Sequence, residues 1–296
     1  MFNCFKFYLD NNFKKKWLTT IVGRIANSNF SLLTQLIIKI FVWFYKIDMS
    51  EAVKQNNHEY ITFNSFFVRL LKAHLRPINP DPNIITVPAD GKISQIGDIK
   101  GNKLFQAKGH YYNIEELLAG DQKMSAKFFN GKFITIYLAP NNYHRVHMPC
   151  NGVLRSMIYV PGNLCSVNSI ATNRIPNLFA RNERIIFYFD TYIGPLIQIM
   201  VGAIIVGSIE TVWAGTIIPP HGGLIKKWYY PEANNKNSIT LLKGQEMAFF
   251  KLGSTVISLF TPDRMEFIAG LEYKKHVTVG TSLAVVKSPI FSKKTK

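Results

Sequence analysis

The chain has 296 residues, of which 47% are hydrophobic, 13% aromatic and only 18% charged. This composition supports a sizeable buried core and excludes a disordered or fibrous protein. The 35 Lys and Arg outnumber the 18 Asp and Glu, giving a formal net charge of +17, which favours an anionic partner, either nucleic acid or acidic lipid. Cys4, Cys150 and Cys165 follow no metal-binding or CxxC spacing, so we expect reduced thiols rather than a disulfide framework.

The N-terminal region is basic and helical in pattern. Its first residues include Asp10 and lack the continuous apolar run of a secretory signal, so we expect a chain that is not exported. Residues 30–47 place apolar side chains at helical spacing, with Lys39 and Lys46 among them. This pattern predicts an amphipathic helix rather than a membrane span. Such a helix either packs on the protein's own core or lies on the surface of an anionic bilayer.

A domain boundary is predicted at residues 76–83, RPINPDPN, because three prolines in eight positions cannot continue a helix. We therefore divide the chain into a helical, membrane-associating arm at 1–75 and a β-rich catalytic core at 76–296. A helical pattern around 63–71 lies in the arm. The core shows short β-type runs at 84–87, 133–138, 153–160, 184–189, 196–208, 238–242 and 254–260.

One helix is predicted among these strands, with Asn113 as N-cap, Glu116 three residues later in a capping box, and Gly120 closing the other end. The expected fold class is α+β, with N-terminal helices followed by a mostly antiparallel β core of barrel-like or sandwich-like form.

Residues 191–209 are nineteen uncharged residues, enough by length to span a bilayer. However, Gly194, Pro195, Gly202 and Gly207 interrupt this stretch, and its apolar residues are largely Ile and Val. That composition is more typical of buried strands joined by glycine turns.

Three turn-rich segments carry reactive side chains: PADGKIS with Asp90, YHRVHMP with His144 and His147, and LGST with Ser254. A serine hydroxyl needs a base, and an imidazole base works best when a carboxylate fixes its tautomer. Asp90, His147 and Ser254 can fill these three roles. Each also has an ordinary structural interpretation, as a turn residue, a packed histidine or the start of a strand.

Other chemistries have weaker support. No GxSxG surrounds a serine, although HGG at 221–223 faintly resembles a lipase oxyanion loop. His144 and His147 form HxxH without a nearby third ligand, so we expect no metal. The sequence shows no phosphate-binding loop and no nucleic-acid-binding motif, so we expect no nucleic acid partner.

Five longer motifs, in this order, resemble those of the phosphatidylserine decarboxylases: PADGKIS, APNNYHRVHMPCNG, VPGNLCSVN with LFARNER, VGAIIVGSIET, and KGQEMAFFKLGSTVISLF. The preceding FFVRLLKAHLRPINPDPN is also similar to that family, and the resemblance covers about residues 60–272. One position departs, because members usually carry Gly where this chain has Ala248. A methyl group there would hinder a backbone that needs positive φ.

The resemblance implies a self-cleaving proenzyme. Ser254 would attack the carbonyl of Gly253, with His147 as base and Asp90 orienting it. The cut between Gly253 and Ser254 would leave chains 1–253 and 254–296, with Ser254 converted into a pyruvoyl group. This covalent cofactor would form a Schiff base with phosphatidylserine and act as the electron sink during loss of CO2. Neither metal nor pyridoxal phosphate is implied.

The same resemblance assigns His144 as the acid that protonates the substrate Cα before phosphatidylethanolamine is released. It implies a lyase of phospholipid biosynthesis, peripheral at the cytoplasmic face of the bacterial cell membrane, with phosphatidylserine as substrate and a homodimer of cleaved protomers. Two alternatives stay open: a membrane-surface serine hydrolase using Asp90, His147 and Ser254, and a non-catalytic lipid-binding relative.

Overall fold

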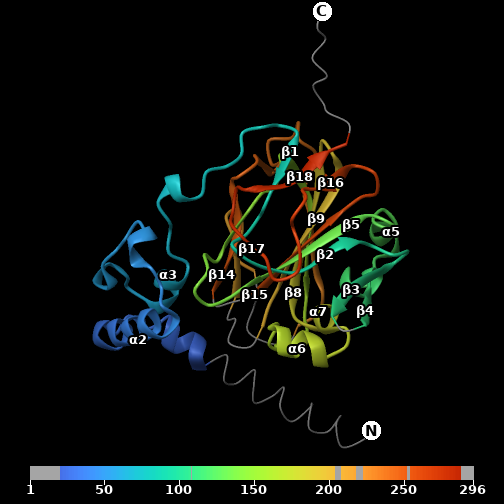
Figure 1. The fold of residues 1–296 in the computed structure, drawn as a ribbon. Helices are drawn as coiled ribbons and strands as arrows, with labels where there is room; N and C mark the ends of the chain where they lie inside the picture. The colour runs from blue at the N-terminus through green and yellow to red at the C-terminus, as the bar shows by residue number, and fades with distance from the viewer. Residues whose placement is uncertain (1–20, 108, 204–207, 218–222, 252–253, 288–296) are drawn as a thin grey trace, which may run out of the picture.

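The computed structural model describes residues 21–107, 109–203, 208–217, 223–251 and 254–287. A small helical arm, residues 21–75, lies beside a larger antiparallel β core (Figure 1). The expected α+β class is confirmed. The barrel form that we allowed for the core is not found, because within the described residues the two end strands of the main sheet do not pair with each other.

The arm consists of short helices around its own apolar cluster. These are α2 (Ser31–Tyr45) and α3 (Phe63–Phe67), with the 3-10 turns η1 (Met49–Glu51), η2 (Asn57–Glu59) and η3 (Ala73–Leu75). The Phe41 ring of α2 lies 5.1 Å from that of Phe63 and 6.1 Å from that of Phe66. Ile38 and Phe66 are fully buried. The helix predicted at 30–47 therefore forms, and one of its faces packs on α3.

The main sheet of the core has nine strands in the order β12-β7-β8-β9-β15-β5-β2-β17, with β13 also paired to β7. Every strand pair in it is antiparallel. The strands are β2 (Gly91–Asp98), β5 (Lys132–Leu138), β7 (Gly152–Val160), β8 (Arg184–Thr191), β9 (Gly194–Val201), β12 (Lys226–Tyr229), β13 (Thr240–Leu241), β15 (Ser254–Phe260) and β17 (His276–Val277).

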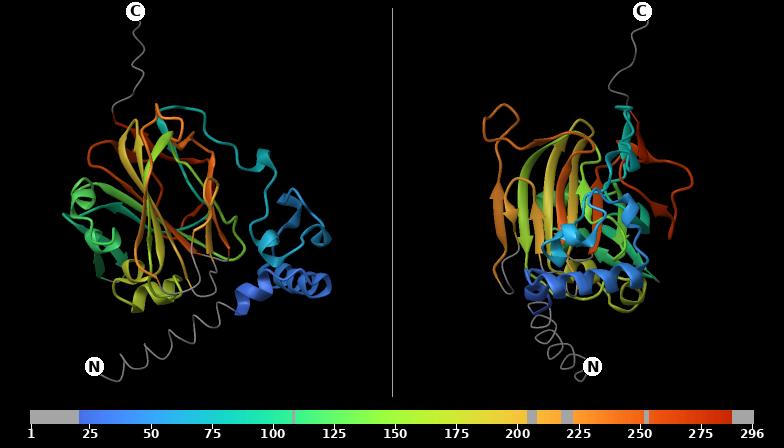
Figure 2. Two further views of the ribbon diagram at one scale, coloured as in Figure 1. Left: turned by 180° about the vertical axis from the view of Figure 1, so that it is seen from behind. Right: turned by 90° about the vertical axis from the view of Figure 1, so that its left-hand side faces the viewer.

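Smaller sheets and short helices surround this one (Figure 2). A three-stranded sheet contains β1 (Ile84–Thr86), β18 (Ser282–Val286) and β16 (Met265–Phe267). A four-stranded sheet contains β11 (Gly215–Thr216), β10 (Ser208–Thr211), β14 (Glu246–Lys251) and β6 (Arg145–His147). The remaining elements are the hairpin β3 (Lys103–Ala107) and β4 (His110–Asn113), and helices α4 (Ile114–Leu117), α5 (Gln122–Ala126), α6 (Ser169–Arg174) and α7 (Leu178–Arg181).

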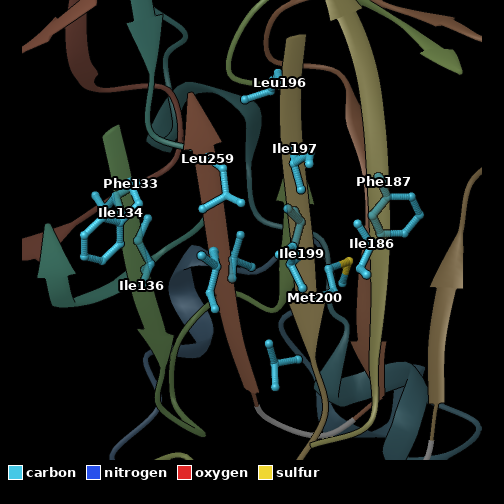
Figure 3. Close-up of a cluster of buried hydrophobic side chains, with 14 of the residues drawn as sticks. Phe133, Ile134, Ile136, Ile186, Phe187, Leu196, Ile197, Ile199, Met200 and Leu259 are labelled. Atoms are coloured by element: carbon cyan, nitrogen blue, oxygen red, sulfur yellow. The ribbon is translucent and has the colours of Figure 1, made fainter. Parts of the chain in front are cut away.

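The uncharged stretch at 191–209 supplies a central strand of the main sheet. All residues of β9 from Leu196 to Val201 are buried, so both faces of this strand are covered. Ile197, Ile199 and Leu259 lie in the apolar cluster across β5, β15, β9 and β8 (Figure 3). Burial on both faces explains why the segment reads as continuously apolar. No helix among the described residues has the length and apolar character needed to cross a bilayer.

Most predicted strands form, but one predicted strand and one predicted helix are shorter than expected. The run predicted at 238–242 yields only the two residues of β13. The predicted helix at 63–71 ends at Phe67, because the following segment pairs with the arm through an Ala52–Leu71 bridge and a Val53 N–H bond to the Leu70 carbonyl. This tertiary pairing overrides the helical spacing of the apolar residues.

The predicted cap of α4 is partly right. Asn113 is the N-cap, and Gly120 closes the end of the helix in the left-handed region with φ +81°. The Asn113 side chain accepts its hydrogen bond from the Glu115 N–H. Glu116 does not complete a capping box, because its carboxylate accepts a bond from Asn177.

Arg184 joins the helices to the sheet from within the core. Its guanidinium is buried and donates to the carbonyls of Leu117, Ala180, Asn182 and Glu116 at 2.7–2.9 Å. Burial lowers its pKa to about 10, so it stays charged at neutral pH. This one side chain thus donates to four carbonyls at the ends of α4 and α7.

We expect Arg184→Met to destabilise the fold by about 3 kcal/mol or more, because it leaves buried carbonyl groups without donors. Urea unfolding measures this loss, with the exposed Arg174→Met on α6 as control. Equal stability of the two variants would contradict the structural role assigned to Arg184.

Candidate active site

Ser254 begins β15, a central strand of the main sheet. Its backbone pairs with Leu138, the last residue of β5, and the next residue, Thr255, pairs with Tyr137 and Val201. Gly253, the expected cleavage position, lies outside the described residues. Pairing with β5 from Ser254 onwards and with β9 from Thr255 onwards thus fixes the start of β15 among the central strands of the main sheet.

The segment that carries both histidines begins after Leu138, the residue of β5 that pairs with Ser254. It returns as β6, which is antiparallel to β14. The arm packs on this segment: Arg145 donates from Nε to the Val68 carbonyl at 2.9 Å and from Nη1 to both oxygens of Glu246 at 2.7 Å. The segment is therefore held between the arm and the core.

His147 is oriented by a backbone carbonyl. Its Nδ1 lies 2.8 Å from the Gly244 oxygen, which requires a proton on Nδ1 and leaves the Nε2 lone pair available. The Tyr143 hydroxyl lies 3.4 Å from Nε2. Burial lowers the pKa of His147 below its ordinary value, against the opposing effects of the Gly244 bond and of Glu246 and Asp90. The imidazole is thus neutral at neutral pH, as a base must be.

Gly244 reaches His147 from a turn that requires glycine. Its φ is +80°, and a Cβ at this position would lie 2.6 Å from the Cγ1 atom of Ile78. Any side chain here would strain the backbone or displace Ile78.

Asp90 is buried and bound by other groups. Its Oδ2 accepts from Arg76 Nη2 at 2.6 Å and Nε at 2.8 Å, and its Oδ1 accepts from the Val279 N–H at 2.8 Å. The Asp90 side chain is 4% exposed and that of Arg76 18%. Asp90 is thus hydrogen-bonded to Arg76, and His147 is hydrogen-bonded to Gly244. The Asp90 carboxylate therefore acts on His147 through its charge.

His144 is fully buried and faces the arm. Its ring stacks on Phe67 with centroids 4.1 Å apart, and its Nε2 lies 3.4 Å from the Pro140 carbonyl. Its Nδ1 has no hydrogen-bond partner among the described residues. Burial first, and then the charge of Arg69, lower its pKa to about 3. His144 is therefore neutral in this structure.

Ala248, the one departure from the family pattern, is an ordinary strand residue. It lies fully buried in β14, pairs with Val146 and Thr211, and is absent from the described non-glycine residues that have positive φ. Its methyl group therefore sits in extended backbone without the strain that a left-handed conformation would impose.

A cavity of about 220 Å³ lies beside this region. It is lined by β2 and β5, including Lys92 and Tyr137, by residues 167–169 at the start of α6, and by Lys274. Tyr137 is the strand partner of Thr255. Two lysines make this cavity suitable for an anionic group close to the start of β15.

Sequence reasoning missed Arg76, Tyr143 and Gly244 as parts of the site. Arg76 lies in the proline-rich boundary, 14 positions before Asp90, and a cation near a candidate catalytic carboxylate was an available signal. Gly244 carried no such signal, because its role rests on a backbone carbonyl and a positive φ. The HGG of the hydrolase alternative has His221 and Gly222 outside the described residues.

Comparison with known proteins identifies relatives over nearly the whole chain. A family model described as "Phosphatidylserine decarboxylase" matches residues 63–285. Proteins named "Phosphatidylserine decarboxylase proenzyme" from Salmonella paratyphi B and Salmonella newport are each 56% identical over 284 residues, covering 96% of this chain and 88% of the relative. These matches support the decarboxylase interpretation and not the serine hydrolase.

Burial of neutral His144 predicts acid sensitivity. The unfolded chain takes up this proton near pH 6.5, whereas the folded chain does so only at about 3. Stability is thus lost as the pH falls from 6.5 towards 3, at about 1.4 kcal/mol per pH unit. His144→Phe keeps a ring against Phe67 but has no group to protonate. Between about pH 6.5 and 4.5, the free energy of unfolding of this variant should fall by about 2 to 3 kcal/mol less than that of the parent.

Urea unfolding at a series of pH values measures this difference in stability. Both proteins carry Ser254→Ala, so that neither is a mixture of cleaved and intact chains. Parallel pH profiles for the two proteins would show that His144 is not held neutral by the fold.

Proposed function

This chain belongs to the phosphatidylserine decarboxylase family, and we propose that it converts phosphatidylserine to phosphatidylethanolamine with a pyruvoyl group made from its own Ser254. The relatives are named proenzymes, which supports processing of the chain. The observation that carries the proposal is the pairing of Ser254 with Leu138, because the segment bearing His144 and His147 starts at that residue.

Self-cleavage is assigned to Ser254 and His147. The Ser254 hydroxyl oxygen attacks the Gly253 carbonyl while His147 Nε2 takes the proton, and the peptide nitrogen leaves with a proton from the imidazole. An ester joins the two residues. Removal of the Ser254 Cα proton expels the Gly253 carboxylate and leaves dehydroalanine, which tautomerises and reacts with water to release ammonia. Support comes from the Nδ1 bond to Gly244, which leaves Nε2 as the basic atom.

The pyruvoyl carbonyl supplies an electron sink for the charge left when CO2 departs. The region has features that fit such a group: His144 Nδ1 and Thr255 Oγ1 are buried polar atoms without a partner among the described residues. We assign His144 to protonate the substrate Cα. It is neutral in this structure, and an anionic headgroup beside it would raise its pKa towards the range of a useful acid.

The cavity lined by Lys92 and Lys274 is proposed to hold the anionic headgroup. Its lining residue Tyr137 pairs with Thr255, which follows Ser254. The ammonium groups of the two lysines would balance the charge of the phosphate as it leaves water.

The arm is proposed to hold the enzyme on the cytoplasmic face of the cell membrane. The face of α2 that does not pack on α3 is itself apolar, with Leu32, Leu36, Ile40 and Trp43 between 54% and 78% exposed. An exposed apolar row of this kind inserts into the boundary of a bilayer. α2, α6 and the start of β15 lie at the same end of the molecule (Figures 1 and 2).

This arrangement would let a headgroup reach the site while its tails stay in the bilayer.

Two further expectations stay predictions. One is the division into an arm at 1–75 and a core at 76–296, and the other is the homodimer of cleaved protomers.

Intact-mass spectrometry tests the proposed maturation. We expect two fragments, residues 1–253 and 254–296, with the smaller one blocked by a keto group and shifted in mass by borohydride. Ser254→Ala should stay one chain. His144→Ala should cleave yet decarboxylate poorly. A wild-type protein of full-length mass without decarboxylase activity would refute the proposal, and reaction of that chain with a fluorophosphonate would favour the hydrolase.

Liposome co-sedimentation tests the membrane role of the arm. The double variant Leu36→Ser, Trp43→Ser should bind anionic vesicles at least ~10-fold more weakly, because each side chain contributes about 1.5 kcal/mol or more when buried in lipid. Val285→Ser removes a partly exposed apolar side chain from β18, at the other end of the molecule (Figure 1), and serves as the control. Equal binding by all three proteins would refute the membrane role of α2.

A further inference from the structure

Within the part of the chain that the structure describes, two residues supply the hydrogen-bond donors to the Asp90 carboxylate. Arg76 contributes contacts of 2.6 and 2.8 Å to Oδ2 and 3.1 Å to Oδ1, and the Val279 N–H contributes 2.8 Å to Oδ1. A carboxylate bound side-on by a guanidinium is fixed in rotation as well as in position. Asp90 therefore cannot turn towards another donor without breaking this pair.

Arg76 is itself held in place. Its Nη1 donates to the Leu75 carbonyl at 3.0 Å, and Pro77 follows it in the chain. Nη2 also lies 3.4 Å from Glu51 of η1, whose side chain is 40% exposed. The contact to Glu51 is long and open to water, whereas the pair with Asp90 is short and buried, so Asp90 is the principal partner of Arg76.

Among the described residues, Asp90 makes no hydrogen bond to His147 and acts on it through charge. The His147 Nδ1 proton is already donated to Gly244 at 2.8 Å. The charged groups that act on His147 are Glu246, Asp90 and Arg145, and the Tyr143 hydroxyl faces its Nε2. We expect a free Asp90 to compete with Gly244 for the Nδ1 proton and to disturb the ring orientation that the Gly244 bond sets.

We propose that Arg76 is a positioning residue for self-cleavage: it holds Asp90 away from the His147 Nδ1 proton while keeping its charge close enough to stabilise the imidazolium that forms. The inference rests on the proposed function, in which His147 is the base. Arg76 touches neither Ser254 nor substrate in this account, and it acts only through Asp90.

The test follows self-cleavage of freshly made wild-type chain, Arg76→Gln, Arg76→Lys and Glu51→Gln by intact mass over time. Arg76→Gln should cleave at least ~10-fold more slowly, and Arg76→Lys, which keeps the charge, should recover part of the rate. Glu51→Gln removes the other carboxylate from Arg76 and should stay within ~2-fold of wild type. Circular dichroism establishes that each chain is folded.

Two readouts separate positioning from a merely structural role. The chains of Arg76→Gln that do mature should decarboxylate phosphatidylserine with wild-type kcat and KM per pyruvoyl group. In an Asp90→Asn background, Arg76→Gln should add no further slowing, because its effect passes through Asp90. A lowered kcat in matured Arg76→Gln would overturn the inference. So would an Arg76→Gln substitution that slows self-cleavage equally in the wild-type and Asp90→Asn backgrounds.

Other outcomes identify which assignment fails. Wild-type cleavage by Arg76→Gln, while Asp90→Asn cleaves slowly, overturns the role of Arg76 and leaves the triad in place. Wild-type cleavage by Asp90→Asn overturns the triad and, with it, this inference. If Arg76→Gln does not fold, Arg76→Lys decides: wild-type cleavage by a folded Arg76→Lys chain supports a need for charge, and failure of that variant to fold shows a structural role and overturns the inference.

Discussion

A buried carboxylate needs donors, and the partners of Asp90 join three separate parts of this chain. Arg76 directly follows the arm, Asp90 directly precedes β2, and Val279 lies in the segment between β17 and β18. An ionised group left in an apolar interior without such partners would be strongly destabilising. The interaction therefore couples the position of the arm to that of the core, next to the histidine that we assign as base.

The docking of the arm has a second consequence, for the histidines. Phe67 of α3 covers the ring of His144, and the carbonyl of Val68 accepts a bond from Arg145, which directly follows His144 in the chain. The same short helix also packs against α2, whose other face is apolar and exposed. α3 thus connects the exposed apolar face of α2, which we propose as the membrane surface, with the segment that carries both histidines.

The strand order places Ser254, the serine that we propose as reactive, at the start of a paired strand. β15 lies between β9 and β5, so Ser254 starts a strand paired on both sides rather than a loop. A group held by paired backbone keeps its orientation through bond cleavage and later catalysis. The apolar content of β9, which in sequence resembled a membrane span, is what a strand covered on both faces requires.

Several features of the fold followed from local sequence. The strands at 84–87, 133–138, 153–160, 184–189 and 254–260 and the helix at 30–47 form where pattern predicted them, because the apolar spacing that identifies each element is also what buries it. The Asn113 cap and the Gly120 ending were local as well. The end of α3 and the partner of Glu116 were not, since a distant segment decides each of them.

The site divides in the same way. The sequence by itself determined the family and a set of candidate residues, Asp90, His144, His147 and Ser254, because long motifs in order are specific even where single residues are not. Only the tertiary structure decided their partners. Arg76 binds Asp90 across 14 positions and Gly244 binds His147 across 97, and hydrogen bonds at such separations depend on how the backbone returns, which no local pattern encodes.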